Sequence, residues 1–163
     1  ADAAAERTRA QLRRGGVRAL AARMAERAPD FGPPAMHPSA GATLVAARPP
    51  LVAFNLQLAP PATIADARAI AADIREGGPA GLPGLRAIGV ALGHGAAQVS
   101  MNVERPLELP LARVVEVVRA RAKLASAELV GLAPAAALVG FPTDVPIPGF
   151  DPARHVIENA LRC

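Results

Sequence analysis

The segment that most constrains this chain is a loop of proline, glycine and small residues that leads directly into a strand-like alternation. It covers residues 30–58, with the sequence DFGPPAMHPSAGATLVAARPPLVAFNLQL. Pro33 and Pro38 each fix a backbone angle and remove a hydrogen-bond donor, while Gly32 and Gly41 admit conformations that other residues avoid. A helix is therefore excluded here, and we expect a stiff, shaped loop attached to a sheet.

The alternation after the loop has the period of two that is typical of a β-strand. Its apolar side carries Val52, Phe54, Leu56 and Leu58, and its other side carries Ala53, Asn55 and Gln57. The same period recurs at residues 87–92, 97–104 and 126–132, and apolar residues follow helical spacing from Ile64 to Ile74 and from Leu111 to Ala122. The order strand, helix, strand, strand, helix, strand predicts an α+β, ferredoxin-like βαββαβ sandwich, an antiparallel sheet with helices on one face.

Helices are also expected at both ends of the chain. Residues 2–14 predict a helix that Gly15 and Gly16 end, followed by a second helix with Val17, Leu20 and Met24 on one side. Thr63 and Asp66 have capping-box spacing before the first helix of the sandwich. Near the other end, Asp151 and Pro152 predict the start of a short helix that includes residues 156–161.

The second face of the predicted sheet carries neutral polar side chains. They are Asn55 and Gln57 on one strand and Gln98, Ser100 and Asn102 on another. Solvent-facing strands usually carry charged residues, whereas amides and hydroxyls both donate and accept hydrogen bonds. Such a face suits a ligand or a partner domain, although the same amides could simply form hydrogen bonds beneath another layer.

Composition narrows the function classes. The net charge of +4 comes from residues 1–28, which hold seven arginines and three acids, and the remainder of the chain has eleven charges of each sign. With no basic stripe and no Trp or Tyr, we expect no nucleic-acid partner. The single Cys163 and the lack of a long apolar run predict a cytoplasmic protein without a disulfide, a cysteine metal cluster or a membrane span.

Several motifs resemble the formiminotransferase family of glutamate formimidoyltransferases. They are PDFGP at 29–33, HP at 37–38, GAT at 41–43, AFN at 53–55, QVSMN at 98–102, SAELVGL at 126–132 and VIEN at 156–159. Ala47 replaces the glycine that usually precedes Arg48, and the proline-rich residues 141–150 replace a helix. The matches extend over nearly the whole chain.

The resemblance implies a one-carbon transferase that moves a formimino group from N-formimino-L-glutamate to tetrahydrofolate in histidine degradation. Residues 1–28 would be the terminal helices of the N-terminal subdomain, and residues 29–163 the C-terminal subdomain. It implies a folate-binding loop made of Gly32, Pro33, Pro34, Ala35, Met36, His37, Pro38, Ser39, Ala40 and Gly41. The substrate-pocket candidates are Asn55, Gln98, Ser100 and Asn102.

The resemblance assigns the catalytic histidine to the N-terminal subdomain, upstream of this chain, so no catalytic residue is expected here. His37 is a candidate ligand contact, whereas His94 and His155 are expected to be solvated, and no metal site is predicted. The expected partners are the N-terminal subdomain and a second copy in a homodimer. The alternative is a non-catalytic ferredoxin-like module that binds folate or regulates a separate partner.

Overall fold

The computed structural model describes residues 12–45, 49–93 and 95–161. The chain forms two compact units, Ala1–Arg48 and Pro49–Cys163. Most of the helix predicted over residues 2–14, and His94 in the hairpin turn, lie outside the described residues. Within those residues, no helix has both the length and the apolar character needed to cross a membrane.

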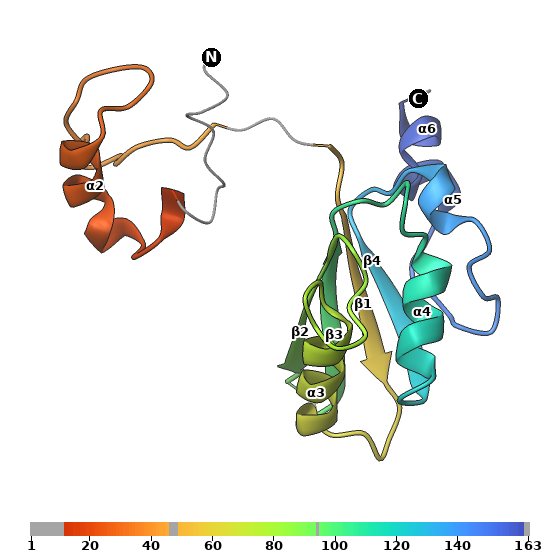
Figure 1. Cartoon of the computed structure of the whole chain (residues 1–163). Helices are drawn as coiled ribbons and strands as arrows, with labels where there is room; N and C mark the ends of the chain where they lie inside the picture. The colour runs from red at the N-terminus through yellow and green to blue at the C-terminus, as the bar shows by residue number, and fades with distance from the viewer. Residues whose placement is uncertain (1–11, 46–48, 94, 162–163) are drawn as a thin grey trace. The chain divides into compact units, whose positions relative to one another are not determined.

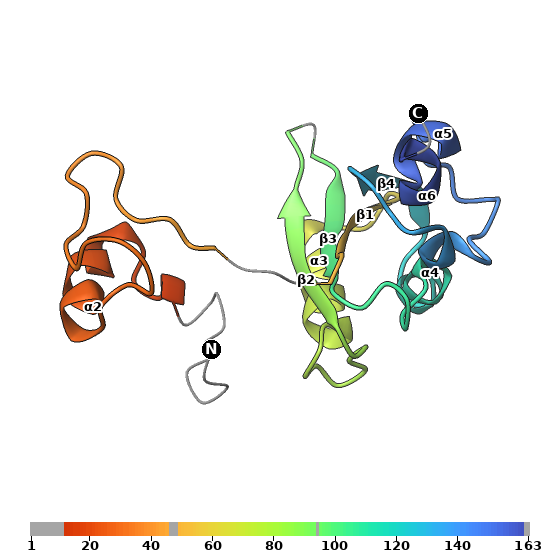
Figure 2. The same cartoon turned by 90° about the horizontal axis from the view of Figure 1, so that it is seen from above.

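The second unit is built on one antiparallel sheet of four strands. The strands are β1 (Val52–Leu58), β2 (Leu85–Ala91), β3 (Ala97–Val103) and β4 (Leu124–Val130), in the order β2-β3-β1-β4. Helices α3 (Ile64–Ile74) and α4 (Leu111–Arg119) connect them and lie on the same side of the sheet (Figures 1 and 2). The predicted α+β, ferredoxin-like sandwich is confirmed.

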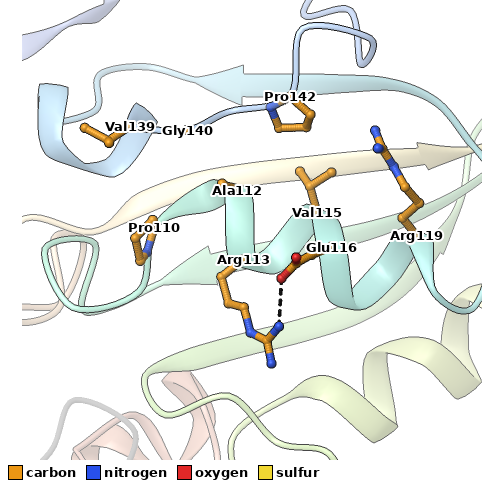
Figure 3. A pocket seen from close by; sticks show the side chains of 9 residues that line it. All are labelled: Pro110, Ala112, Arg113, Val115, Glu116, Arg119, Val139, Gly140 and Pro142. Atoms are coloured by element: carbon orange, nitrogen blue, oxygen red, sulfur yellow. Dashed lines mark hydrogen bonds and ion pairs between the residues drawn. The ribbon is translucent and has the colours of Figure 1, made fainter.

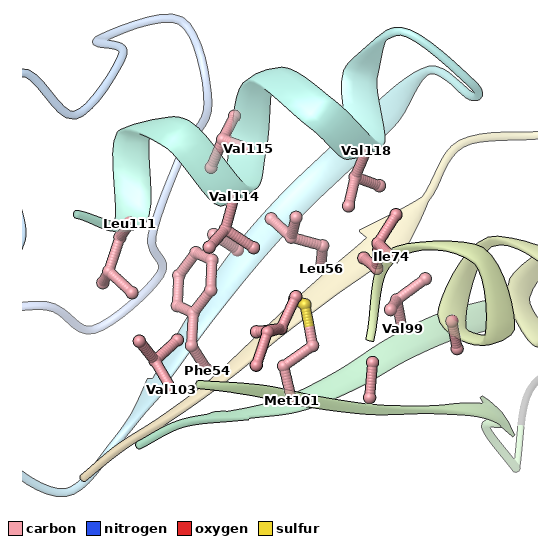
Figure 4. Packing of buried hydrophobic residues seen from close by; sticks show 14 of the residues in the cluster. Phe54, Leu56, Ile74, Val99, Met101, Val103, Leu111, Val114, Val115 and Val118 are labelled. Carbon is pink, nitrogen blue, oxygen red and sulfur yellow. The ribbon is translucent and has the colours of Figure 1, made fainter. Parts of the chain in front are cut away.

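The core lies between the sheet and these two helices. Phe54 and Leu56 of β1 are fully buried, and Figure 4 shows both side chains directed toward the helices. Val114 and Val118 of α4 are also fully buried, as the helical spacing predicted. The Phe54 ring meets Phe141 edge-on, with ring centroids 6.0 Å apart, so the segment after β4 also covers part of the core.

The fourth strand is shifted from its predicted position. The alternation predicted residues 126–132, whereas β4 runs from Leu124 to Val130. Gly131 has a φ of +81°, a left-handed conformation that turns the chain away from the sheet. The shift of two residues preserves the alternation, so the same side chains face the core.

The second strand places Ile88 and Val90 on the uncovered face. Ile88 is 62% exposed there, whereas Leu85 and Ala87 point into the core. Gly89 also faces the helices, and a Cβ atom on it would lie 2.4 Å from the backbone nitrogen of Arg68 in α3. Helix α3 therefore packs so closely on β2 that only glycine fits at this position.

Replacing Gly89 by alanine is expected to destabilise the sandwich. The added methyl group meets helix backbone, which must move, and overpacking of this kind costs about 1–3 kcal/mol. Gly93→Ala is the matched control, because a Cβ atom at Gly93 meets nothing within 4 Å. Urea unfolding followed by circular dichroism measures both variants, and an equal loss of stability in both would contradict the close packing of α3.

Helix α3 begins with the predicted capping box. The Thr63 side chain accepts a hydrogen bond from the Asp66 backbone N–H at 3.3 Å, and an Asp66 carboxylate oxygen accepts from the Thr63 N–H at 2.7 Å. These contacts satisfy donors that the first turn of a helix otherwise leaves open. The hydrogen bonds from the backbone and side chain of Thr63 lower the pKa of the Asp66 carboxyl group.

The capping box is expected to make stability depend on pH. Because the folded-state pKa of Asp66 is lowered, its ionised form stabilises the fold above the ordinary carboxyl pKa, and this contribution is lost as the pH falls through the folded value. Asp66→Asn should therefore lower the free energy of unfolding at pH 7 and differ progressively less from the parent below about pH 4. A constant difference across this pH range would contradict the assignment.

The segment after β4 does not form the single final helix that was predicted. It contains η3 (Ala135–Leu138), α5 (Pro152–His155) and α6 (Ile157–Ala160). Val156 between the last two is extended and forms a parallel bridge with Ala133, with hydrogen bonds of 2.9 and 3.0 Å. The prediction of the helix start is confirmed, because the Asp151 side chain accepts a hydrogen bond from the Ala153 N–H.

Candidate functional site

The uncovered face of the sheet carries three rows of side chains that cross all four strands. Residues paired across antiparallel strands point to the same side of the sheet. In the order β2, β3, β1 and β4, the first row contains Arg86, Asn102, Ala53 and Val130; the second, Ile88, Ser100, Asn55 and Glu128; the third, Val90, Gln98, Gln57 and Ser126. We call these twelve residues the open face. All four substrate-pocket candidates belong to it.

The second row is joined by hydrogen bonds across three strands. The Ser100 hydroxyl donates to Asn55 Oδ1 at 2.8 Å, and Asn55 Nδ2 donates to Glu128 Oε2 at 2.7 Å. The Asn55 amide therefore has one orientation, with its oxygen toward β3 and its nitrogen toward β4. This orders the centre of the open face before any ligand arrives.

The other two rows are less connected. In the third row the Ser126 hydroxyl donates to Gln57 Oε1 at 3.3 Å. Among the described residues, the side chains of Gln98 and Asn102 have no hydrogen-bond partner. Gln98 is half-buried and Asn102 is exposed, so both amides offer donors and acceptors to a molecule on this face.

The open face has exposed apolar side chains on both of its edge strands, next to the neutral polar groups of the central strands. Ile88 on β2 is 62% exposed and Val130 on β4 is 50% exposed. Arg86 also lies at the β2 edge, where its Nε is 2.7 Å from a carboxylate oxygen of Glu104. A flat molecule with polar edges therefore finds both apolar contacts and hydrogen-bond partners here.

The predicted folate loop lies in the first unit, together with η2 (Val17–Ala19) and α2 (Leu20–Glu26). Its second half is a tight hairpin in which His37 and Gly41 exchange backbone hydrogen bonds of 3.1 and 3.0 Å. Gly41 has a φ of +70°, so it makes the turn without the strain that a side chain would add. The loop is shaped, as the prolines and glycines predicted.

His37 holds this hairpin through one ring nitrogen. Its Nδ1 accepts hydrogen bonds from the backbone N–H groups of Ser39 and Ala40, at 3.3 and 3.1 Å. These bonds leave the proton of a neutral ring on Nε2. The side chain is exposed, so Nε2 is a hydrogen-bond donor that a ligand can reach.

Two grooves lie elsewhere on the second unit. One, of about 410 Å³, lies between α4 and residues 139–142, and Figure 3 shows Arg113 paired with Glu116 on its wall, at 2.7 Å. The other, of about 650 Å³, is apolar and lies between η3 and residues 141–156. Neither groove includes a residue of the open face or of the predicted folate loop.

The structure corrects the expectation for His155. It was expected to be solvated, but it is half-buried, and its ring stacks on Phe150 with centroids 5.7 Å apart. Its Nδ1 also accepts from the Asp151 backbone N–H at 3.0 Å. In the described ranges, no three His, Cys, Asp or Glu side chains are grouped as metal ligands.

Sequence reasoning did not assign Glu128 to the polar face of the sheet. The polar face was predicted from two strands, the segments that became β1 and β3, and β4 was not among them. Joining Glu128 to Asn55 requires the pairing of β1 with β4, which are 73 residues apart at this contact. The available signal was the alternation in residues 124–130, which places Ser126, Glu128 and Val130 on one side.

The fold and the open face define a ferredoxin-like α+β domain with one polar face available for a ligand or partner. No protein-family model matches the chain. The chain is 37% identical to the glutamate formimidoyltransferase of Streptococcus pyogenes serotype M1 over 161 residues, which are 93% of this chain and 53% of that protein. The resemblance to the formiminotransferase family is therefore confirmed.

The chain is also similar to the formimidoyltransferase-cyclodeaminases of two animals. The formimidoyltransferase-cyclodeaminase of Sus scrofa is 45% identical over 100 residues, covering 56% of this chain and 18% of that protein. That of Gallus gallus is 37% identical over 146 residues, covering 82% of this chain and 27% of that protein. The chain thus spans about half the length of the bacterial relative and less of the animal ones.

Proposed function

We propose that this chain supplies the folate-binding half of a glutamate formimidoyltransferase. The reaction transfers the formimino group of N-formimino-L-glutamate to N5 of tetrahydrofolate, a step of histidine degradation. The main support is the similarity to formimidoyltransferases over 93% of the chain. The ordered polar face, with an oriented Asn55 at its centre, supports a role in binding.

On this proposal the open face forms one wall of the site, and the loop from Gly32 to Gly41 contributes to holding tetrahydrofolate. Asn55, Gln98, Ser100 and Asn102 face a reactant whose ring edges carry both donors and acceptors. Neutral amides and hydroxyls match such edges in either direction. The exposed Nε2 of His37 adds a donor from the loop.

The chemistry itself is assigned to the N-terminal formiminotransferase subdomain. The bond between the formimino carbon and the glutamate nitrogen breaks, and a bond from that carbon to N5 of tetrahydrofolate forms. N5 loses a proton and the glutamate nitrogen gains one, so a general acid and base is required. A histidine of that subdomain takes this role, and the residues of this chain bind and orient.

We also propose that the protein is a cytoplasmic homodimer. The open face includes exposed apolar side chains such as Ile88 and Val130, and exposed patches of this kind often mark interaction surfaces. The N-terminal subdomain covers this face, or a second copy does so where that subdomain is absent. Light scattering that finds a monomer at high concentration would argue against the dimer.

The experiment uses the full-length protein with tetrahydrofolate and N-formimino-L-glutamate. Mass spectrometry should detect 5-formiminotetrahydrofolate and glutamate in equal amounts, and neither product when one substrate is omitted. Titration calorimetry with folinic acid tests binding separately. Binding without transfer would favour the non-catalytic folate module, and no binding would exclude both functions.

A further inference from the structure

Glu128 is an uncompensated carboxylate on the open face. The face has two charged residues, Arg86 and Glu128, which lie on the opposite edge strands β2 and β4. Arg86 is paired with Glu104, whereas none of the ion pairs among the described residues includes Glu128. The negative charge of Glu128 is therefore available to a ligand.

The hydrogen-bond chain of the second row holds this carboxylate in place. Ser100 orients the amide of Asn55, and Asn55 Nδ2 donates to Glu128 Oε2 at 2.7 Å. A carboxylate has about four lone-pair sites on its two oxygens, and this contact uses one of them. Glu128 is thus a positioned acceptor with most of its capacity free, and its side chain is exposed.

The surroundings of Glu128 favour a planar ligand. Val130 lies two residues along β4, is 50% exposed and is paired with Ala53 of β1. These two side chains form a small apolar floor beside the carboxylate. A flat ring that lies on this floor would point one edge at Glu128.

We infer that Glu128 binds a planar N–C–N unit that carries an N–H group on each nitrogen. A carboxylate accepts two parallel hydrogen bonds from such a unit, as it does from a guanidinium group. The inference rests on the proposed function, because both reactants contain the unit. It is the formamidine group of N-formimino-L-glutamate, or the 2-amino and N3–H edge of the pteridine ring.

The test is Glu128→Gln in the full-length protein. Glutamine has the same shape and still accepts from Asn55, so the fold and the second row are retained while the charge and one acceptor are lost. Glu116→Gln is the control, because Glu116 lies on α4, away from the open face, and loses the same charge. Folinic acid affinity is measured by calorimetry, and the KM for N-formimino-L-glutamate by product formation at saturating tetrahydrofolate.

Glu128→Gln should weaken the binding of one of the two ligands by about tenfold or more, because hydrogen bonds to charged groups contribute strongly to affinity. The Glu116→Gln control should change the binding of neither ligand by more than about twofold. Weaker folinic acid binding alone assigns the pteridine edge, and a higher KM for N-formimino-L-glutamate alone assigns the formamidine. No change in either, with the parent still binding folinic acid, overturns the role of Glu128 and leaves the proposed function intact. If Glu128→Gln weakens the binding of both ligands equally, the site has lost its shape, and a direct contact between Glu128 and either ligand is overturned. A parent protein that binds neither ligand overturns the proposed function as well.

Discussion

Phe54→Ala is expected to lower the free energy of unfolding of the second unit by about 3–5 kcal/mol. Phe54 is fully buried between β1 and the helices, and its ring also meets Phe141 edge-on. Truncation removes the largest fully buried side chain and leaves a cavity that the strands paired on both sides of β1 cannot close. Domains of this size are stable by only about 5–15 kcal/mol, and at about 4 °C for each kcal/mol lost the thermal midpoint should fall by about 12–20 °C.

Phe31→Ala is the matched control for this prediction. Phe31 is the same residue type, but its side chain is 93% exposed, so its truncation should change the midpoint by less than about 2 °C. Calorimetry or circular dichroism on both variants makes the comparison. A small effect at Phe54, or similar effects at both positions, would contradict the location of the core.

Asn55→Ala in the full-length protein is expected to weaken folinic acid binding by about tenfold to a hundredfold. Asn55 links β3 to β4 through Ser100 and Glu128, so its removal frees both partners and disorders the centre of the open face. The cost to stability should be about 1 kcal/mol, since the residue is only half-buried and its partners can bind water.

Asn159→Ala is the control for Asn55→Ala, because it removes an asparagine side chain at a position outside the open face. Asn159 also donates through its side chain, to the Pro152 carbonyl, but it belongs to α6 and not to the open face. The control should bind folinic acid as the parent does. If Asn55→Ala binds folinic acid with unchanged affinity, the open face is not a wall of the folate site.

Local patterns were sufficient to predict the sandwich. Strand β1 and the apolar stripe of α4 are confirmed because each follows from the spacing of neighbouring residues. The capping box of α3 depends on Thr63 and Asp66 alone, three residues apart, and it is also confirmed. The polar candidates share a face for the same reason, since alternation determines the side of a strand on which a residue lies.

The features that were missed depend on contacts between distant residues. Alternation grouped Gly89 with Ala87 but did not reveal that this side of β2 faces α3, because the larger side chains of Ile88 and Val90 lie on the other side. The final helix is split by a bridge between Val156 and Ala133, 23 residues away. Glu128 joins the candidate site only through the pairing of β4 with β1.

The folate loop remains a prediction for a related reason. The hairpin from His37 to Gly41 confirms a shaped loop, but binding by these residues rests on the family resemblance. The loop belongs to the first unit and the open face to the second. Their joint contribution to one site is therefore a proposal about the complete protein.

A crystal structure of the full-length protein with folinic acid tests the central claim most directly. We expect the ligand to lie over the open face, within hydrogen-bond distance of Asn55 or Glu128. A ligand held over the helices, or in the groove beside α4, with the open face in solvent, would contradict it.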